Sequence, residues 1–463
     1  MDITTLLISF VKIVAVVAYF YGLFWVMGIK GKKIRLGAKE IDISLLVNTL
    51  GVLAGYLVIQ LALTPFGSFA VLTNFDRGLL FQACSMVMVA LGLNLIYGFN
   101  GQFSLGQYGF YGIGAYTAAD ITFRWINGDS RGLIVVGIGT ILGGVVILFI
   151  RKFLSGLRRM PVLSSFTLYL IGSLIAGVVA VFAGKFLAPF VNPLLGNALA
   201  PGVLNQTVPM YFVFFLAVIF AGIFAAEVSF LFGLPVLSLG SDYFGIATLG
   251  FTIVVYTLMV NSDTILPFPE MKGGRGMIGI PKLTTWFWAF FFMMLVIITM
   301  RNIIRSSTGR SIMSVREDEI AARSMGINVA ETKLMSFVIG SLFAGIGGGV
   351  YAHYIGFLSP GAFDFLVGFN PLIIIVFGGL GSMTGTITAS FGWIFFLEGT
   401  LREILGKIST EAPSWRYVLY PLTLLLLMLV RPQGLLGSVE WGFLKSKVIP
   451  LRKAKNTDEV KTA

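Results

Sequence analysis

The residues best suited to chemistry lie in one charged stretch, residues 316–326, which reads Arg-Glu-Asp-Glu-Ile-Ala-Ala-Arg-Ser-Met-Gly. The chain is 57% hydrophobic and only 12% charged, so this run of opposite charges differs sharply from its surroundings. Paired charges set the register in which two protein surfaces dock. The stretch therefore predicts a docking element rather than a catalytic centre, with a solvated loop helix as the alternative.

Local signals in and beside this stretch predict a helix of about ten residues. Ser314 with Glu317 three residues later is typical of a capping box. Glu319 and Arg323 have the spacing of an i,i+4 ion pair. Gly326 suits the left-handed position that follows a helix. The apolar side chains expected to be available for contact are Val315, Ile320, Ala321 and Met325.

Catalytic groups are scarce in the rest of the chain. His353 is the single histidine and Cys84 the single cysteine, which excludes an internal disulfide and a cysteine-based metal cluster. We expect both side chains to be packed. The phosphate-binding pattern Gly-x-x-x-x-Gly-Lys-Ser/Thr does not occur, and the run Lys-Gly-Gly-Arg-Gly at 272–276 has the wrong spacing. We therefore predict no catalytic residue, no metal site and no ATP hydrolysis by this chain.

Two stretches place glycines and polar residues directly after an apolar run, at 97–106 and at 377–385. Corresponding glycine-broken segments in two halves of a chain are typical of transporters built from an internal repeat. Dipoles and small residues at such a break could conduct a polar solute. The candidate residues of a translocation path are Gly98, Asn100, Gly101, Gln102, Ser104, Gln107, Gly378 and Gly381.

The elements that must position these residues are long apolar runs. Continuous runs of this length predict a polytopic, all-α transmembrane bundle, whereas a β-barrel would show alternation. We expect about 10–13 segments, some short or broken by glycine. They are residues 6–28, 43–64, 78–98, 108–126, 133–150, 162–183, 210–232, 242–260, 284–300, 334–356, 365–380, 385–402 and 417–430. The close glycines inside them are expected to pack helices together.

The charges between the segments predict their orientation. The net charge of +12 comes from basic residues spread over short loops, which is the pattern of the positive-inside rule and not of a nucleic-acid-binding face. The stretches placed in the cytoplasm are 30–42, 99–107, 151–161, 233–241, 301–333, 381–384 and 431–463.

Four ionisable residues fall inside the apolar segments: Lys12, Asp120, Glu227 and Glu398. We expect each to lie near a segment end, where its side chain reaches the interface. Charges at the bilayer midplane mark ion pathways, so their expected absence argues against an ion-coupled carrier.

Motifs in collinear order resemble those of LivM-type permeases, the transmembrane subunits of ABC importers for branched-chain amino acids. One is the charged stretch itself, and another is Arg-Pro-Gln-Gly-Leu-Leu at 431–436. The others are residues 91–98, 109–116, 231–237, 240–251, 343–345, 356–360 and 377–382. The similarity covers roughly residues 80–130 and 210–437.

This resemblance implies an importer permease in which a short cytoplasmic helix docks into an ATPase subunit. The residues it assigns to that coupling element are Arg316, Glu317, Asp318, Glu319, Ala321, Arg323 and Gly326. The implied partners are a second related permease, two cytoplasmic ATPase subunits that bind ATP and magnesium, and an extracytoplasmic binding protein. The implied location is the bacterial inner membrane, and the chain binds no cofactor itself.

The expected organisation has three parts. Residues 1–77 hold anchor helices and a basic loop, residues 78–437 form the permease core, and residues 438–463 form a basic tail. An extra hairpin at about 127–209 is absent from the family pattern, and its basic inner turn is expected to contact lipid headgroups or another subunit. The outer loop 261–282 lacks the family's Pro-Asn and is expected to face the binding protein or the access path.

The predicted function is that of an import permease for leucine, isoleucine and valine. A permease for urea or short amides is the closest alternative, because the same polar groups would pass urea. A stand-alone carrier, and a membrane-embedded enzyme or scaffold, are more distant alternatives that leave the charged stretch without a role.

Overall fold

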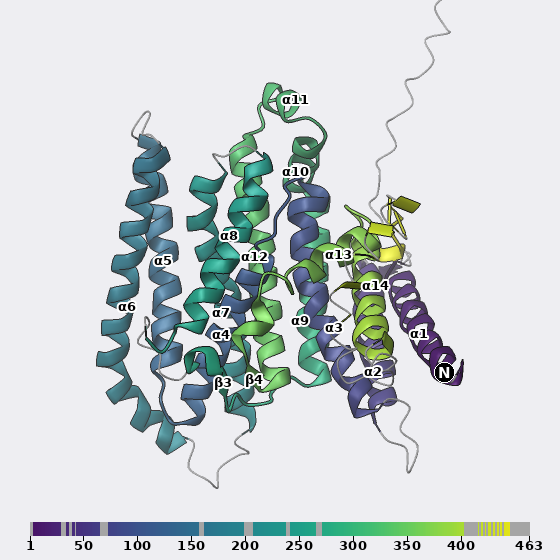
Figure 1. Cartoon of the computed structure of the whole chain (residues 1–463), viewed down its shortest axis with the longest axis horizontal. Helices are drawn as coiled ribbons and strands as arrows, with labels where there is room; N and C mark the ends of the chain where they lie inside the picture. Colours follow the sequence, from purple (N-terminus) through teal and green to yellow (C-terminus); the bar gives the residue numbers. More distant parts are fainter. Residues whose placement is uncertain are drawn as a thin grey trace, which may run out of the picture.

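The computed structural model describes residues 3–28, 34–36, 39–41, 43–64, 73–156, 162–198, 207–237, 241–264 and 271–401, with short pieces between 415 and 444. Nearly all of these residues are helical (Figure 1). Two short antiparallel pairs are the exceptions in the described chain: β1–β2 (Ile34–Leu36 with Lys39–Ile41) and β3–β4 (Met277–Ile278 with Phe357–Leu358). The predicted all-α fold is confirmed.

Apart from α10 and α11, which lie in the charged loop, the helices follow the predicted apolar runs. They are α1 (Ile3–Gly28), α2 (Ile43–Leu63), α3 (Asn74–Leu93), α4 (Gln107–Ile126), α5 (Arg131–Gly156), α6 (Val162–Ala198), α7 (Thr207–Val236), α8 (Ser241–Val260), α9 (Trp286–Arg305), α10 (Ser307–Glu317), α11 (Glu319–Ser324), α12 (Val329–Ile355), α13 (Phe369–Gly378) and α14 (Met383–Trp393). Two continue as π-helical turns, α3 into η1 (Asn94–Phe99) and α14 into η5 (Ile394–Leu401). Short 3₁₀ turns are η3 (Gly273–Arg275), η4 (Pro360–Phe363) and η7 (Gly442–Leu444). The predicted segment 417–430 falls largely outside the described residues.

Seven described helices are long and apolar enough to cross a membrane, judged by length and composition. They lie within α3 with η1, α5, α6, α7, α8, α9 and α12. Shorter apolar stretches occupy parts of α1, α2 and all of α13. A helix of about 20 residues matches the thickness of the hydrocarbon core. The chain is therefore a multi-pass membrane protein.

Glycine lets α12 lie unusually close to its neighbours. A Cβ atom added at Gly348 would stand 2.0 Å from the carbonyl oxygen of Tyr111 in α4, and one at Gly345 would stand 2.7 Å from the Cβ of Ala225 in α7. Close backbone approach of this kind is how small residues pack helices in lipid. The predicted packing role of these glycines is confirmed.

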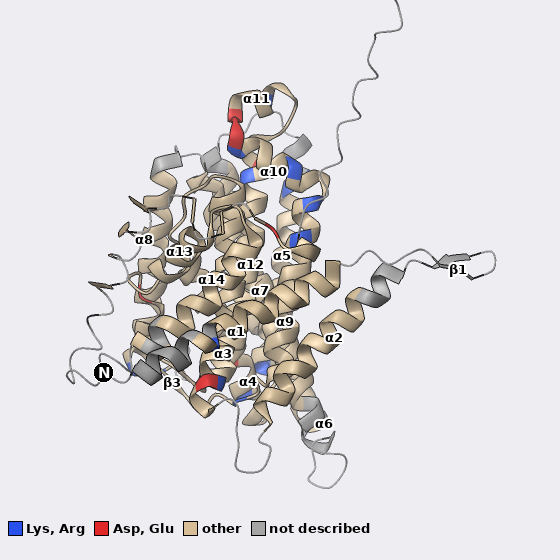
Figure 2. Ribbon diagram, turned by 90° about the vertical axis from the view of Figure 1, so that its right-hand side faces the viewer, with Lys and Arg blue, Asp and Glu red and all other residues tan. Residues whose placement is uncertain are grey.

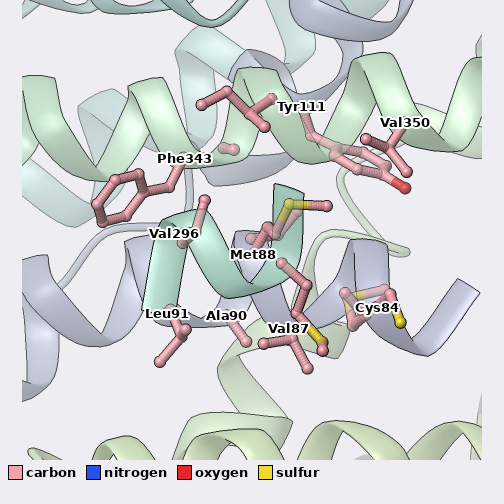
Figure 3. Packing of buried hydrophobic residues seen from close by; sticks show 14 of the residues in the cluster. Cys84, Val87, Met88, Ala90, Leu91, Tyr111, Val296, Phe343 and Val350 are labelled. Atoms are coloured by element: carbon pink, nitrogen blue, oxygen red, sulfur yellow. The ribbon is translucent and has the colours of Figure 1, made fainter. Parts of the chain in front are cut away.

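The core lies where α3, α9 and α12 meet. Cys84 and Leu91 of α3, Val296 of α9 and Phe343 of α12 are all buried in one apolar cluster. Figure 3 shows these side chains filling the space between the helices. Cys84 packs as a small apolar side chain, as predicted.

One end of the bundle collects the loops predicted to share a side. Arg316 of the loop 301–333 bonds the backbone of Gly98, and Arg151 at the end of α5 forms an ion pair with Glu331. The pair β3–β4 lies at the opposite end (Figure 1). Charged residues gather around α10 and α11, and few lie across the middle of the bundle (Figure 2). The predicted grouping of these loops is present in the fold.

The extra hairpin is formed by α5 and α6, which pack beside α4 and α7 at one edge of the molecule (Figure 1). Its outer face is apolar and exposed, as for Phe182 at 67% and Phe186 at 70%. Exposed phenylalanines on a membrane helix are expected to face lipid. The second helix is longer than predicted and reaches Ala198, past Pro189 and Pro193.

The placement of the ionisable residues differs from the prediction. Glu227 lies inside α7, and its carboxylate fits beside Gly143 of α5, where a Cβ would be 2.9 Å from Oε2. Lys12 lies within α1 and pairs with Asp76 at 2.9 Å. A glycine opposite Glu227 leaves room for its carboxylate, which the sequence of α7 alone does not reveal. Glu227 is thus an ionisable residue well inside a membrane helix, and an ion-coupled carrier is not excluded by a lack of such residues.

The other two ionisable residues lie toward helix ends. Asp120 is in the second half of α4 and pairs with Arg124 at 2.9 Å. Glu398 falls in η5, and its side chain is outside the described residues. The expectation holds for the position of Asp120.

Candidate functional site

The charged stretch forms two short helices rather than one. Ser314 does not cap a helix, because it lies inside α10 and donates to the carbonyl of Ser311. The chain breaks at Asp318, whose backbone is extended, and its carboxylate accepts from the N–H groups of Ile320 and Ala321 at 2.8 and 3.0 Å. Asp318 is thus the N-cap of α11. The predicted capping box is wrong because the chain is already helical at Ser314 and the next helix begins only after Asp318.

The end of α11 agrees with the prediction. Gly326 has φ +82, and the N–H groups of Gly326 and Ile327 bond to the carbonyls of Arg323 and Ala322. This is the Schellman arrangement that ends many helices. Both ends of α11 are therefore fixed by specific hydrogen bonds.

The loop has its own small core. Val315 of α10, Ala322 of α11 and Val329 of α12 are buried together. Ile320 and Met325, in contrast, are 80% and 83% exposed. Ile320 and Met325 are therefore available for contact at the tip of the loop, as predicted. Val315, which was also expected to be available, is buried in the core of the loop.

The ion pairing of the loop also differs from the predicted one. Glu319 pairs with Lys333 in the first turns of α12, and no ion pair joins it to Arg323 in the described chain. Glu331 of the same helix pairs with Arg151. These pairs fasten the loop to α12 and to the extra hairpin rather than reinforcing α11 internally.

Arg316 brings the loop and the predicted translocation path together. Its Nη1 donates to the carbonyl oxygen of Gly98 at 2.6 Å. Its side chain covers Gly101, where a Cβ would lie 3.4 Å from Arg316 Cγ, and passes Gly381, where a Cβ would lie 2.8 Å from Nη1. The glycine at position 381 makes room for the guanidinium, and Gly101 lies against the aliphatic part of the same side chain. The two glycine-broken stretches thus meet at one arginine.

Asn94 joins the same two stretches from inside the bundle, and the sequence reasoning did not select it. Its Nδ2 donates to the carbonyl of Ser382 at 2.9 Å and to Oγ1 of Thr386 at 2.8 Å. Its Oδ1 accepts from the N–H of Gly381 at 2.9 Å. A Cβ at Gly98 would lie 1.8 Å from this Oδ1. The sequence signal that could have identified Asn94 is a single asparagine within the apolar run 78–98.

Residues 100–106 are not helical and run between η1 and α4. Thr248 Oγ1 of α8 accepts from the N–H of Leu105 at 3.0 Å. Asn100 Nδ2 donates to Oε1 of Gln102 at 2.8 Å and to Oγ of Ser336 at 2.6 Å. Ser104 is fully buried. Irregular backbone at membrane depth is tolerated where protein buries it or where it lines a polar path.

The last two path residues have different surroundings. Gln107 is the first residue of α4 and is 2% exposed, yet neither atom of its amide has a partner in the described chain. Gly378 ends α13, and a Cβ there would lie 2.3 Å from the carbonyl of Gly385 in α14. Gly378 therefore allows the tight turn between α13 and α14, whereas Gln107 has unused polar groups.

The N-terminus of α14 is capped by Ser382, which accepts from the N–H of Gly385, and also by a residue of the tail. The carboxylate of Glu440 accepts from the N–H groups of Met383 and Thr384 at 2.6 and 3.1 Å. A carboxylate suits a helix N-terminus because of the unpaired N–H groups and the positive end of the dipole. Burial raises the pKa of Glu440 above its ordinary value, and these hydrogen bonds act against that shift.

Two further features lie away from this region. His353 is buried, with Nε2 at 2.7 Å from Oγ1 of Thr122 and Nδ1 at 2.7 Å from the carbonyl of Gly349, so it is packed as predicted. A cavity of about 470 Å³ is lined by Tyr56, Gln60, Leu63, Thr64, Arg77, Thr285, Trp286 and Phe287. None of the predicted path residues lines that cavity.

The loop 261–282, which the sequence predicts to lie outside, forms a turn and a short strand. Its described part, from 271, contains η3 and β3, and β3 pairs with β4 directly after α12. Lys272 has the left-handed φ of 53, and Gly273 follows with the same value. The loop is thus anchored to the C-terminal end of α12.

A family model described as "Branched-chain amino acid transport system / permease component" matches residues 77–193 and 187–429. LivM of Escherichia coli, named a high-affinity branched-chain amino acid transport system permease protein, is 32% identical over 251 residues. The alignment covers 47% of this chain and 56% of that protein, so the chain spans little more than half of this relative.

Two other relatives are more distant. LivM of Methanocaldococcus jannaschii, a probable branched-chain amino acid transport permease, is 25% identical over 48% of this chain and 67% of its own length. LivH of Escherichia coli, another permease protein of the high-affinity system, is 25% identical over 42% of this chain and 64% of its own length. No solved structure matches the chain.

Proposed function

This chain belongs to the family of branched-chain amino acid transport permeases, and we propose that it forms one half of the membrane pathway of an ATP-driven importer. The proposed substrates are leucine, isoleucine and valine. A second, related permease completes the pathway, two cytoplasmic ATPase subunits drive it, and an extracytoplasmic protein delivers the substrate. The proposed location is the inner membrane of a bacterium.

The relatives support the pairing of two permeases. The chain is similar both to LivM and to LivH of Escherichia coli, which are named as permeases of the same high-affinity system. Because the chain is closer to LivM, we assign it the LivM position. LivH-like chains are then the expected partners.

The observation that carries the mechanism is the contact of Arg316 with Gly98. The tip of the loop presents Ile320 and Met325 to solvent, where an ATPase subunit could cover them. The base of the loop is bonded to Gly98 in the first glycine-broken stretch and lies against Gly381 in the second. A movement imposed at the tip by ATP hydrolysis would therefore reach the pathway through Arg316.

Co-purification tests the assembly. The chain is tagged in its native host, and we expect a second permease and two ATPases to co-purify. Ile320→Asp places a charge in the proposed docking surface without touching the buried core of the loop, so the ATPases should be lost while the second permease remains. Ile278→Asp, the same change at an exposed residue of β3, is the matched control. A wild-type chain that purifies alone would contradict the proposal.

Uptake tests the substrate. The complex is reconstituted in liposomes with its binding protein, and ATP-dependent uptake of labelled leucine is compared with that of labelled urea. Leucine uptake is the expected result. Uptake of urea but not of leucine would contradict the proposed substrates and support a permease for urea or short amides.

A further inference from the structure

We propose that the cavity between α2, α3 and α9 binds the head group of an anionic phospholipid, with the guanidinium of Arg77 on the lipid phosphate. The lining residues are Tyr56, Gln60, Leu63, Thr64, Arg77, Thr285, Trp286 and Phe287. The inference goes beyond the proposed function, because it concerns a ligand that is bound and not transported. It depends neither on the proposed substrates nor on the ATPase subunits.

The first support is the size and the position of this cavity. Its volume is about 470 Å³, which falls within the range of small-molecule sites. It lies where α2 ends and where α3 and α9 begin. Because α9 leads directly into α10, the cavity is at the opposite end of the bundle from the charged loop (Figure 1). Two of its three helices, α3 and α9, are long and apolar enough to cross a membrane, so their ends are at the depth of lipid head groups.

The second support is the charge of the lining. Arg77 is the one charged residue among the eight, and none of them is acidic. Its guanidinium lies 5.5 Å from the ring of Phe81 and has no ion pair or hydrogen bond with the residues that the structure describes. The neighbouring Asp76 is already paired with Lys12. A guanidinium offers parallel N–H donors that match the oxygens of a phosphate, so the cavity favours an anion of that kind.

The third support is the set of polar groups that the lining leaves without a partner. The hydroxyl of Tyr56, the amide of Gln60 and the hydroxyl of Thr285 bond no other group in the described part of the chain. In contrast, the indole of Trp286 and the hydroxyl of Thr64 donate to backbone carbonyls. The three available groups include donors and acceptors, and the phosphate and hydroxyl oxygens of a lipid head group match them.

The fourth support is an apolar strip that leaves the cavity along α9. Phe287 lines the cavity, and Phe291 and Leu295 follow it at intervals of four residues, so the three share one face of the helix. They are 48%, 37% and 37% exposed. The rings of Phe287 and Phe291 lie 6.1 Å apart. An acyl chain attached to a head group in the cavity would cover this strip, whereas a free phosphate ion would leave it bare. The strip therefore favours a lipid over a soluble anion.

The test measures how added lipid changes the melting temperature of the full-length chain, purified in detergent with its bound subunits. Phosphatidylglycerol is the probe, because its head group carries one phosphate and no positive charge. It should raise the melting temperature, since a ligand that binds only the folded state stabilises that state. The dependence of this increase on lipid concentration gives an apparent affinity.

Three variants locate the lipid. Arg77→Gln should weaken the apparent affinity for phosphatidylglycerol about tenfold, because the charged hydrogen bonds to the phosphate are lost. Arg77→Lys keeps the charge and should weaken it less. Arg275→Gln is the matched control and should bind like the wild type, because Arg275 is exposed in η3 and does not line the cavity. Equal affinities of the wild type and Arg77→Gln would overturn the site.

Two further ligands and one further measurement separate the lipid from other occupants. Inorganic phosphate tests the anion alone, and phosphatidylcholine tests a lipid without net charge. Both should raise the melting temperature less than phosphatidylglycerol does, and an equal effect of inorganic phosphate would overturn the lipid site. Loss of the second permease from Arg77→Gln on co-purification would make the cavity a protein contact and overturn the proposal. Leucine uptake tests the proposed function separately from all of these outcomes.

Discussion

Arg316 and Gly98 are 218 residues apart in the chain, yet Arg316 Nη1 lies 2.6 Å from the carbonyl oxygen of Gly98. The bond joins the end of α10 to the π-helical turn that follows α3. Because the guanidinium also passes Gly381, the same side chain reaches the turn between α13 and α14. One residue of the loop is therefore in contact with both glycine-broken stretches.

Replacing Arg316 should uncouple the loop from the pathway. A hydrogen bond from a charged donor contributes about 1.5–3 kcal/mol, so Arg316→Ala should reduce leucine transported per ATP hydrolysed roughly tenfold. Arg310→Ala is the control, because among the described residues Arg310 on the same helix bonds only the nearby carbonyl of Arg305. Transport and ATP hydrolysis are measured together in liposomes. An unchanged ratio in Arg316→Ala would show that the contact does not transmit the movement.

Gly98→Ala should destabilise the protein strongly. The new Cβ would lie 1.8 Å from Asn94 Oδ1 and 2.5 Å from the backbone nitrogen of Gly381, and overpacking of this kind costs about 3 kcal/mol. Gly392→Ala, in α14, meets no atom within 4 Å and should be neutral or slightly stabilising. Thermal unfolding in detergent measures both. Equal melting temperatures for the two variants would contradict the packing described here.

Asn94→Asp should loosen the turn between α13 and α14. The substitution keeps the acceptor for Gly381 but replaces the donor to Ser382 and Thr386 with an oxygen, so two buried bonds are lost. We expect a loss of about 2 kcal/mol in stability. Asn127→Asp, which removes one exposed bond, is the matched control and should change the melting temperature little. Similar melting of both variants would argue against the role of Asn94.

The helix α11 should fray when either of its ends is altered. Asp318→Ala removes the N-cap at a cost of about 1 kcal/mol, and Gly326→Ala strains a residue with φ +82 by a similar amount, about 1 kcal/mol. Hydrogen exchange of residues 319–325 should become faster in both variants. Asp318→Asn keeps an acceptor and should exchange like the wild type. Slow exchange in Asp318→Ala would show that the loop core, and not the cap, holds α11.

Glu440 should make stability depend on pH. Burial raises its folded-state pKa above the ordinary value of 4.5, so the folded protein holds this proton more tightly than the unfolded chain does. The linked stability is fully present below 4.5 and is lost as the pH rises through the folded pKa. The melting temperature of the wild type should therefore fall over that window more than that of Glu440→Gln. Parallel curves for the two proteins would contradict the shift.

The helical architecture could be predicted because lipid imposes it. Every long apolar run became a helix where the structure describes it, since a membrane leaves the backbone no other partner. The packing of the glycines in α12 follows from the same condition. Residue type and run length alone determine these features.

The contacts of the charged loop could not be predicted in this way. Glu319 had two suitable partners, Arg323 four residues later and Lys333 fourteen residues later, and the second one bonds it. The spacing of residues in the sequence does not show whether Glu319 pairs with a partner on its own helix or with one that the tertiary fold places beside it. Asn94 was missed for the same reason, because its three partners lie nearly 300 residues away.

The bond from Arg316 ends on a main-chain oxygen rather than on a side chain. A backbone carbonyl is present whatever residue types occupy the rest of η1, so most side chains there can change without breaking the link. Side-chain substitutions in η1 that alter solute selectivity would then leave the coupling of transport to ATP hydrolysis unchanged. Such a permease could therefore change the solute that it transports while its coupling to the ATPase subunits stays the same.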